Sequence, residues 1–187
     1  MYFPDFFSLL NSWENEANAL VFGGFLYLVF ITKIFDIKNE SIKKIELNHS
    51  NDTKLIVSKK TREEENFIIN NLPKGETPKS DLIANFLSYF LSNLVFDDVM
   101  ARQETSKENF VTKAKFELFD NIVINALVYQ DSDKKKWIDF DIDSDSIKKL
   151  KANNLIVVED IEKWSYKLPK TKYNTINTKL NDLLVED

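Results

Sequence analysis

The chain contains no cysteine, one histidine and two arginines, and each shortage excludes a class of site. Without cysteine there are no disulfides, no thiolate metal ligands and no cysteine nucleophile. A single histidine, His49, cannot build a histidine-rich metal centre, and histidine-based catalysis is not expected. Arg62 and Arg102 are the only side chains with the planar fork that recognises phosphate or carboxylate in a bidentate way, because every other basic residue is lysine.

Glycine and proline are also scarce, at three and four residues of 187, which excludes collagen-like, linker-like and glycine-rich phosphate-binding designs. An excess of acidic residues gives a formal net charge of −5 and a pI near 5.1, which disfavours a general nucleic-acid binder. Apolar residues make up 43% of the chain and aromatic residues 13%, enough for a packed core. The length fits one domain, or one domain with an appendage.

The longest apolar stretch lies near the N-terminus. Residues Ala19–Thr32 carry no charge, and Ala17–Phe35 is a run of nineteen residues in which Lys33 is the single charge. A membrane-spanning helix takes about 20 apolar residues, with a range of about 17–25. We therefore predict two parts: an apolar N-terminal segment, residues 1–36, that attaches the chain to a membrane through Ala17–Phe35, and a domain over residues 37–187.

Two other interpretations of this stretch stay open. The pair Gly23-Gly24 between two β-favouring runs is also typical of a buried hairpin. A buried core helix is the other alternative, although the run is apolar on all sides and has no single apolar stripe. A cleaved secretory signal is not expected, because no Lys or Arg precedes Lys33. The lysines that follow the run place the domain in the cytoplasm by the positive-inside rule.

Residues 37–187 predict an α+β fold, in which an antiparallel sheet packs against one or two amphipathic helices. Ile45–Val57 alternates between apolar and polar residues across a polar tip, which predicts a hairpin with His49 exposed at the turn. Ser80–Leu94 has a continuous apolar stripe at helical spacing and predicts a helix packed on the sheet. A second amphipathic helix is predicted near the C-terminus, with apolar positions Tyr173, Ile176, Leu180, Leu183 and Leu184.

The middle of the domain predicts a strand meander. Three segments alternate between apolar and polar residues and are joined by short polar turns: Lys113–Phe119, Ile122–Val128 and Trp137–Ile142. A short strand is predicted at Glu65–Asn70, and Val95-Phe96 and Val99-Met100 predict another that passes the acidic pair Asp97-Asp98. Near the end of the chain, alternation of Trp164, Tyr166 and Leu168 predicts that these three side chains face the core together.

Charged clusters supply no recognisable active site. Four aspartates alternate with other residues, as in an EF-hand calcium loop: Asp139, Asp141, Asp143 and Asp145. Such a loop requires Gly at its sixth position and Glu at its twelfth, and neither is present whether the loop is counted from Asp139 or from Asp141. We expect the four aspartates to lie on the solvent face of a strand that runs into an acidic loop.

Two further charge clusters, Glu63–Glu65 and Asp97-Asp98, are interpreted as solvated surface. The run Lys134–Lys136 could form a contact with an anion or a lipid headgroup, but it is too short and isolated for a nucleic-acid surface. The sequence predicts no catalytic, cofactor-binding or metal-binding residue, and no enzymatic activity.

Several segments in order resemble one family of bacterial proteins, the domain-of-unknown-function 4340 family, and specifically its C-terminal half. The segments that carry the resemblance are Phe67–Gly75 (FIINNLPKG), Lys79-Ser80, Leu91–Val99 (LSNLVFDDV), Ala114–Ile124 (AKFELFDNIVI), Lys136–Ile138, Lys163–Pro169 (KWSYKLP), Lys172 and Leu180–Leu183. The resemblance implies a membrane-anchored α+β protein of the inner membrane that faces the periplasm, often encoded beside gliding-motility-type ABC transport components. It assigns no activity and no catalytic residue.

Two functions of different classes follow from these observations. The first is a non-enzymatic, membrane-attached accessory or interaction domain, auxiliary to an ABC-type transport system and without a nucleic-acid partner. The second is a soluble small-ligand-binding α+β domain, which would need an apolar cavity between Ser80–Leu94 and the sheet.

Overall fold

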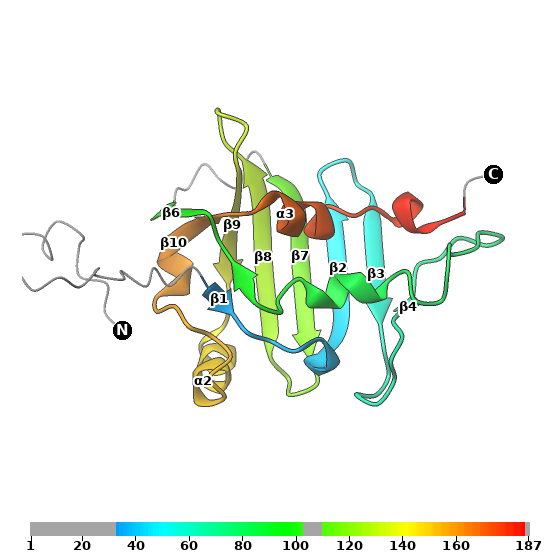
Figure 1. Ribbon diagram of the computed structural model, residues 1–187, viewed down its shortest axis with the longest axis horizontal. Helices are drawn as coiled ribbons and strands as arrows, with labels where there is room; N and C mark the ends of the chain where they lie inside the picture. The colour runs from blue at the N-terminus through cyan, green and yellow to red at the C-terminus, as the bar shows by residue number, and fades with distance from the viewer. Residues whose placement is uncertain (1–32, 103–109, 186–187) are drawn as a thin grey trace, which may run out of the picture. The chain divides into compact units, whose positions relative to one another are not determined.

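Within residues 33–102 and 110–185, the part of the chain that the computed structural model describes, eight strands form one antiparallel sheet (Figure 1). The strands follow each other across this sheet in the order β4-β3-β2-β7-β8-β9-β10-β6, and two further strands, β1 and β5, pair separately. Their bounds are β1 Lys33–Phe35, β2 Ile42–His49, β3 Lys54–Ser58, β4 Ile68–Ile69, β5 Leu94–Val95, β6 Asp98–Ala101, β7 Phe110–Leu118, β8 Val123–Gln130, β9 Lys136–Asp141 and β10 Trp164–Lys167.

Helical structure among the described residues is short. Two α-helices occur, α2 over Ser144–Ala152 and α3 over Lys170–Ile176. Four 3₁₀ segments connect other elements: η1 Asn39–Ser41, η2 Asn85–Tyr89, η4 Ile161–Lys163 and η5 Leu180–Leu183. The predicted α+β fold class is therefore confirmed. No helix in the described ranges is both long enough and apolar enough to cross a membrane.

The central meander forms as the alternation predicts. Strands β7 and β8 pair in the register Phe116↔Ile124, and β8 pairs with β9 in the register Val128↔Ile138. The hairpin of β2 and β3 is also confirmed, with Leu47 opposite Leu55. Residues of these strands that face the core are at most 5% exposed: Ile45, Leu47, Leu55, Val57, Ala114, Phe116, Leu118, Ile124, Ala126, Val128, Ile138 and Phe140.

One face of the sheet is covered by a layer of short helical segments. Figure 1 shows α3 and the chain that follows it crossing in front of the strands, and η2 contacts both α3 and β2. Aromatic rings join the layers: Phe90 stacks on Phe116 of β7 with ring centroids 5.4 Å apart, and Phe35 of β1 meets Phe140 of β9 edge-on at 5.1 Å. Burial of these side chains against the sheet is the main favourable term for the fold.

The predicted anchor Ala17–Phe35 lies outside the described residues except for its last three. Those three, Lys33–Phe35, form strand β1, which pairs with β5, and Ile34 and Phe35 are fully buried in the domain core. The end of the apolar run therefore belongs to the α+β domain and not to the N-terminal segment. The rest of the run, Ala17–Thr32, stays a prediction.

The helix predicted over Ser80–Leu94 is wrong. The backbone bonds there run from each N–H to the carbonyl three residues earlier, as from Leu87 to Ala84, so the segment is a series of turns around η2. Side chains from elsewhere compete for its polar groups, because Lys172 donates to carbonyls at its end and the Asn85 amide binds Asn66 and the backbone of Phe67. The tighter winding leaves part of the predicted stripe exposed.

The second predicted helix is shorter than the pattern suggests. Helix α3 ends at Ile176, and the chain resumes as the separate turn η5 after Lys179, whose backbone N–H donates to Asp182 Oδ2 over 2.8 Å. The apolar positions still face the core, since Ile176, Leu183 and Leu184 are buried. The apolar pattern thus predicted which side chains are buried, but not that the helix ends between Ile176 and Leu180.

Candidate functional site

The sheet face opposite the helical layer carries a groove of about 440 Å³. Most of its lining consists of side chains that alternate with the core residues of the central strands and so point away from η2 and α3; Ala114 and Ala126 are core residues that also border it. We call this surface the open face and define it by the residues that line the groove: Glu46, Asn48, Arg102, Lys113, Ala114, Lys115, Asn125, Ala126, Leu127, Asp139 and Asp141.

A buried ion pair holds one side of this groove. Asp139 of β9 is 1% exposed, and its carboxylate accepts from Arg102 Nε over 3.1 Å and from the Ser165 hydroxyl over 2.6 Å. Arg102 follows β6, and its Nη1 also donates to the carbonyls of Phe140 and Glu162. The cluster therefore ties the edge strand β6 to β9 and β10 and presents the partly exposed guanidinium to the groove.

Tyr129 lies beside this cluster. Its side chain is 5% exposed, and its hydroxyl is the one buried side-chain polar atom without a hydrogen-bond partner among the described residues. Burial raises the pKa of Tyr129, and the neighbouring Ser165 hydroxyl and Arg102 oppose that rise. A phenol that stays protonated can donate a hydrogen bond, so Tyr129 adds a donor at the edge of the cluster.

The open face carries both signs of charge. Lys113, Asn125 and Asp141 are exposed in the centre of the face, and the structure gives Lys113 and Asp141 no ion pair within the described ranges. Toward the other side, Glu46 is held by Lys44 at 2.6 Å and by Lys54 at 3.1 Å. Such a surface can form several polar contacts at once, and its mixed charge favours a polar protein surface over a polyanion.

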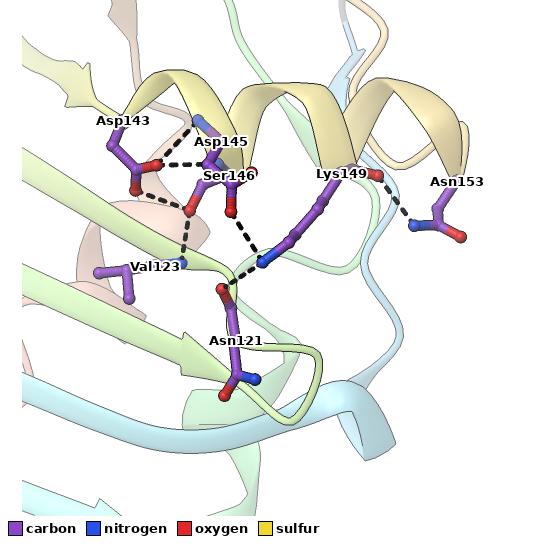
Figure 2. Close-up of polar contacts among 7 residues, drawn as sticks. All are labelled: Asn121, Val123, Asp143, Asp145, Ser146, Lys149 and Asn153. Carbon is purple, nitrogen blue, oxygen red and sulfur yellow. Dashed lines mark hydrogen bonds and ion pairs between the residues drawn. The ribbon is translucent and has the colours of Figure 1, made fainter.

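The alternating aspartates separate into different roles. The prediction that they share a solvent face is wrong for Asp139, which is buried by its pairing with Arg102 and Ser165. Asp143 is the N-cap of α2: Figure 2 shows its carboxylate accepting from the backbone N–H groups of Asp145 and Ser146 and from the Ser146 hydroxyl, at 2.9, 2.9 and 2.7 Å. Within the described part of the chain, no three Asp, Glu or His side chains come together as a metal site.

The residues that begin helix α2 also hold it against the sheet. The Ser146 hydroxyl accepts from the N–H of Val123 at the start of β8 over 3.1 Å, and Lys149 donates to the Asn121 carbonyl over 3.3 Å (Figure 2). The N-terminal half of the helix is thereby fixed to the turn between β7 and β8. The last two aspartates of the pattern that resembles a calcium loop therefore lie at the beginning of a helix, with Asp143 as its N-cap and Asp145 in its first turn.

His49 is buried, not exposed, and that prediction is wrong. The side chain is 5% exposed; Nε2 donates to the Thr178 carbonyl over 3.0 Å, and Nδ1 lies 3.0 Å from the Thr112 hydroxyl. Burial lowers the pKa of His49, which favours the neutral ring. The histidine therefore joins the hairpin tip to the residues that follow α3 and is not a free base.

The lysine run Lys134–Lys136 does not form an anion site in the structure. Lys134 takes a positive φ of 63° in the turn, Lys135 pairs with Asp133, and Lys136 reaches Gln130 and lies 5.0 Å from the centre of the Tyr173 ring. Lys135 and Lys136 therefore make separate contacts, and Lys134 supplies the left-handed residue of the turn. Asp97 and Asp98 are exposed at the start of β6, and Glu63–Glu65 lie in the loop that follows β3.

The core beneath η2 is solid. The space bounded by six apolar side chains has no room for a water molecule: Ile45, Leu47, Leu87, Phe90, Phe116 and Ile176. The apolar cavity that a small-ligand-binding domain would need at this place is therefore missing from the described residues.

Sequence reasoning missed Arg102, Tyr129 and Ser165 as site residues. The one available signal was the rarity of arginine, because Arg102 is one of only two in the chain. Its partner Asp139 lies 37 positions further along in a different strand, so nothing local marks the pair. Comparison of the chain with protein-family models, with curated proteins and with solved structures finds no match. The family resemblance described above stays a prediction.

Proposed function

We propose that this chain is a non-enzymatic, membrane-attached interaction domain, and that the open face of its sheet contacts a protein partner. The observation that carries the proposal is the groove of about 440 Å³ on that face, which combines exposed Lys113, Asn125 and Asp141 with the fixed guanidinium of Arg102. Groups of opposite charge held on a rigid sheet favour a partner with a complementary pattern.

Rigidity supports an interaction surface. The groove floor is formed by paired strands, and the buried cluster of Arg102, Asp139 and Ser165 holds its side at β6 and β10. A pre-organised surface loses less conformational entropy on binding than a flexible one. The solid core below η2 weighs against the alternative of a small apolar ligand inside the domain.

Membrane attachment is proposed through the apolar run. Of the nineteen residues Ala17–Phe35, the three of β1 belong to the domain, so sixteen remain, Ala17–Thr32. A spanning helix takes about 17–25 residues, so a span must either begin before Ala17 or thin the bilayer around it. The run ends directly before β1, which would hold the domain close to the membrane surface.

The class of partner and the location come from the family resemblance. It indicates subunits of an ABC-type transporter, the inner membrane and the periplasmic side. The lysines after the apolar run, Lys33, Lys38, Lys43 and Lys44, favour the cytoplasmic side instead. Protease accessibility of the domain in sealed vesicles of known orientation distinguishes the two sides.

Site-specific photo-cross-linking tests the open face. A photo-reactive residue placed at Asn125 in the full chain, expressed in its native membrane, is expected to give one discrete adduct with an integral membrane protein. Lys113→Glu in the same chain is expected to reduce the adduct at least tenfold, because it reverses a charge in the groove. The matched control places the photo-reactive residue at exposed Lys148 on α2. Equal adducts at both positions, or none at Asn125, would contradict the proposal.

A further inference from the structure

Exposed apolar side chains gather in a part of the chain that does not line the open-face groove. Of the eight large apolar residues that are exposed in the described ranges, five fall within residues 68–89. Leu82, Phe86 and Tyr89 are 59%, 38% and 54% exposed and project from the turns around η2; we call these three the apolar ridge. Ile68 and Leu72 continue the apolar surface beside it.

A groove of about 360 Å³ runs along this ridge and has an acidic rim. Its lining includes Leu82 and Tyr89 of the ridge, next to Phe86, together with four glutamates: Glu40, Glu63, Glu64 and Glu65. We call these four the acidic rim. None of them forms an ion pair within the described part of the chain, although Glu64 accepts from the backbone N–H of Lys60.

Two basic residues of the groove offset part of this negative charge. Arg62 pairs with Asp120, and Lys59 is 5% exposed, donates to the Arg62 carbonyl and lies close enough to Glu40, Glu63 and Glu64 to interact with them electrostatically. The four glutamates still outnumber the two basic residues, so the groove combines apolar contact with an excess of negative charge. Exposed apolar surface of this kind, rimmed by polar groups, is typical of an interaction site.

The negative charge of the groove distinguishes between three possible binding partners: a membrane, a second copy of the chain and a basic protein segment. A bilayer with anionic lipids would be repelled by the acidic rim. A second copy of the chain packed about a two-fold axis would place acidic rim near acidic rim, which like-charge repulsion disfavours. A protein segment with apolar side chains on one face and lysines or arginines on the other complements both kinds of lining residue in the groove.

We propose that the apolar ridge and the acidic rim form a docking groove for a basic, amphipathic segment of a partner protein. This surface is distinct from the open face, and it extends the proposed function by adding a second contact to the interaction domain. Apolar side chains of the partner would cover Leu82, Phe86 and Tyr89, and its basic side chains would pair with the glutamates. The ridge residues supply the affinity, and the rim selects the sign of the partner's charge.

Three synthetic peptides immobilised on a biosensor test the groove with the full chain in non-ionic detergent. The first is an amphipathic peptide of leucine and lysine, the second replaces each lysine with glutamate, and the third replaces each leucine with serine. The parent chain is expected to bind the leucine–lysine peptide at least tenfold more tightly than either of the others. Detergent bound to the apolar run would contribute equally to the two leucine-containing peptides, so it cannot produce this difference.

Variants assign the binding to the groove. Phe86→Ser combined with Tyr89→Ser is expected to weaken binding of the leucine–lysine peptide at least tenfold. Changing Glu63, Glu64 and Glu65 to glutamine is expected to weaken it and to flatten its dependence on salt. The matched control is Val99→Ser, an exposed apolar residue on β6 at the other edge of the sheet, which should bind like the parent.

Two results would overturn the groove assignment. One is unchanged binding by the Phe86 and Tyr89 variant, or equal binding of the leucine–glutamate peptide. The other is ridge-dependent binding to vesicles of anionic lipid in place of the leucine–lysine peptide, which would make the surface a membrane contact. The cross-link at Asn125 does not depend on this groove, so failure here leaves that test of the interaction domain standing.

Discussion

At the scale of single residues, Lys172 shows how one side chain holds two parts of the helical layer together. Its ammonium donates to the carbonyls of Tyr89, Phe90 and Ser92 over 2.9, 2.8 and 2.9 Å. These carbonyls end the η2 segment and have no helical partner, so the lysine of α3 takes the place of a continued helix. Burial lowers the pKa of Lys172 to about 8.

Replacing Lys172 tests this role. Lys172→Met keeps the apolar stem and removes the three donated hydrogen bonds, so we expect the free energy of unfolding to fall by about 2 kcal/mol. Urea denaturation at pH 7 measures the change. Lys170→Met, at an exposed position of the same helix, is the matched control and should stay within about 0.5 kcal/mol of the parent. Equal effects of the two substitutions would show that the three carbonyls do not depend on Lys172.

The same pair of proteins has a pH signature with a defined sign. The pKa of Lys172 is about 8 in the folded state and near 10.5 when unperturbed, so the unfolded chain binds more protons between these values. The stability of the parent relative to Lys172→Met should therefore rise as the pH increases from 8 to 10.5. A relative stability that does not rise over this window would mean that the carbonyl contacts offset the cost of burying the charge.

Residue roles of this kind could not be predicted from the sequence. Lys172 acts on carbonyls 80 to 83 positions away, and His49 binds a carbonyl 129 positions away. Both look exposed when only their neighbours in sequence are considered. Roles that depend on local alternation were predicted better, since Tyr166 and Leu168 are buried as expected and Trp164 is half-buried against the same core.

At the scale of elements, helix α2 depends on its N-cap, Asp143. The Asp143 carboxylate satisfies two backbone N–H groups at the helix start and carries negative charge at the positive end of the helix dipole. Asp143→Ala is therefore expected to melt at a lower temperature than the parent, measured by circular dichroism at pH 7. Asp141→Ala removes an exposed carboxylate two residues earlier and should melt like the parent.

Acid should remove this difference. Hydrogen bonds from the Ser146 backbone and hydroxyl lower the pKa of Asp143 below its ordinary value of 3.8. Stabilisation by a carboxyl with a lowered pKa is fully present above the ordinary value and is lost as the pH falls through the lowered one. The melting temperatures of Asp143→Ala and the parent should thus converge below pH 3.8. A difference that persists unchanged in strong acid would contradict the capping role.

Strands were easier to predict than helices in this chain, for a physical reason. Alternation in β7, β8 and β9 reflects two faces with different surroundings, and neighbouring strands in sequence pair with each other. The segment Ser80–Leu94 has a pattern suited to a helix, but its geometry is decided by Asn66, Asn85 and Lys172. Contacts made by other segments of the chain override the local preference there.

At the scale of the whole molecule, the two faces of the sheet have different functions. The face toward η2 and α3 holds the core, and the open face keeps charged side chains in contact with solvent. The fold class and most of the core residues could be predicted from the sequence, because both follow from the alternation of apolar and polar residues along the strands. The open-face cluster could not, because Arg102, Asp139 and Ser165 come from three strands or strand ends that only the topology brings together.

The central claim is that this folded domain acts at a membrane to which the apolar run attaches it. Membrane fractionation of the full chain, followed by alkaline carbonate extraction, tests it most directly. The parent chain should remain with the membranes. Leu26→Lys should move to the soluble fraction, because a lysine at the centre of a span costs about 2.5–3.5 kcal/mol, while its near-UV circular dichroism stays that of a folded domain. A soluble parent chain, or a Leu26→Lys variant that remains equally bound, would contradict the account.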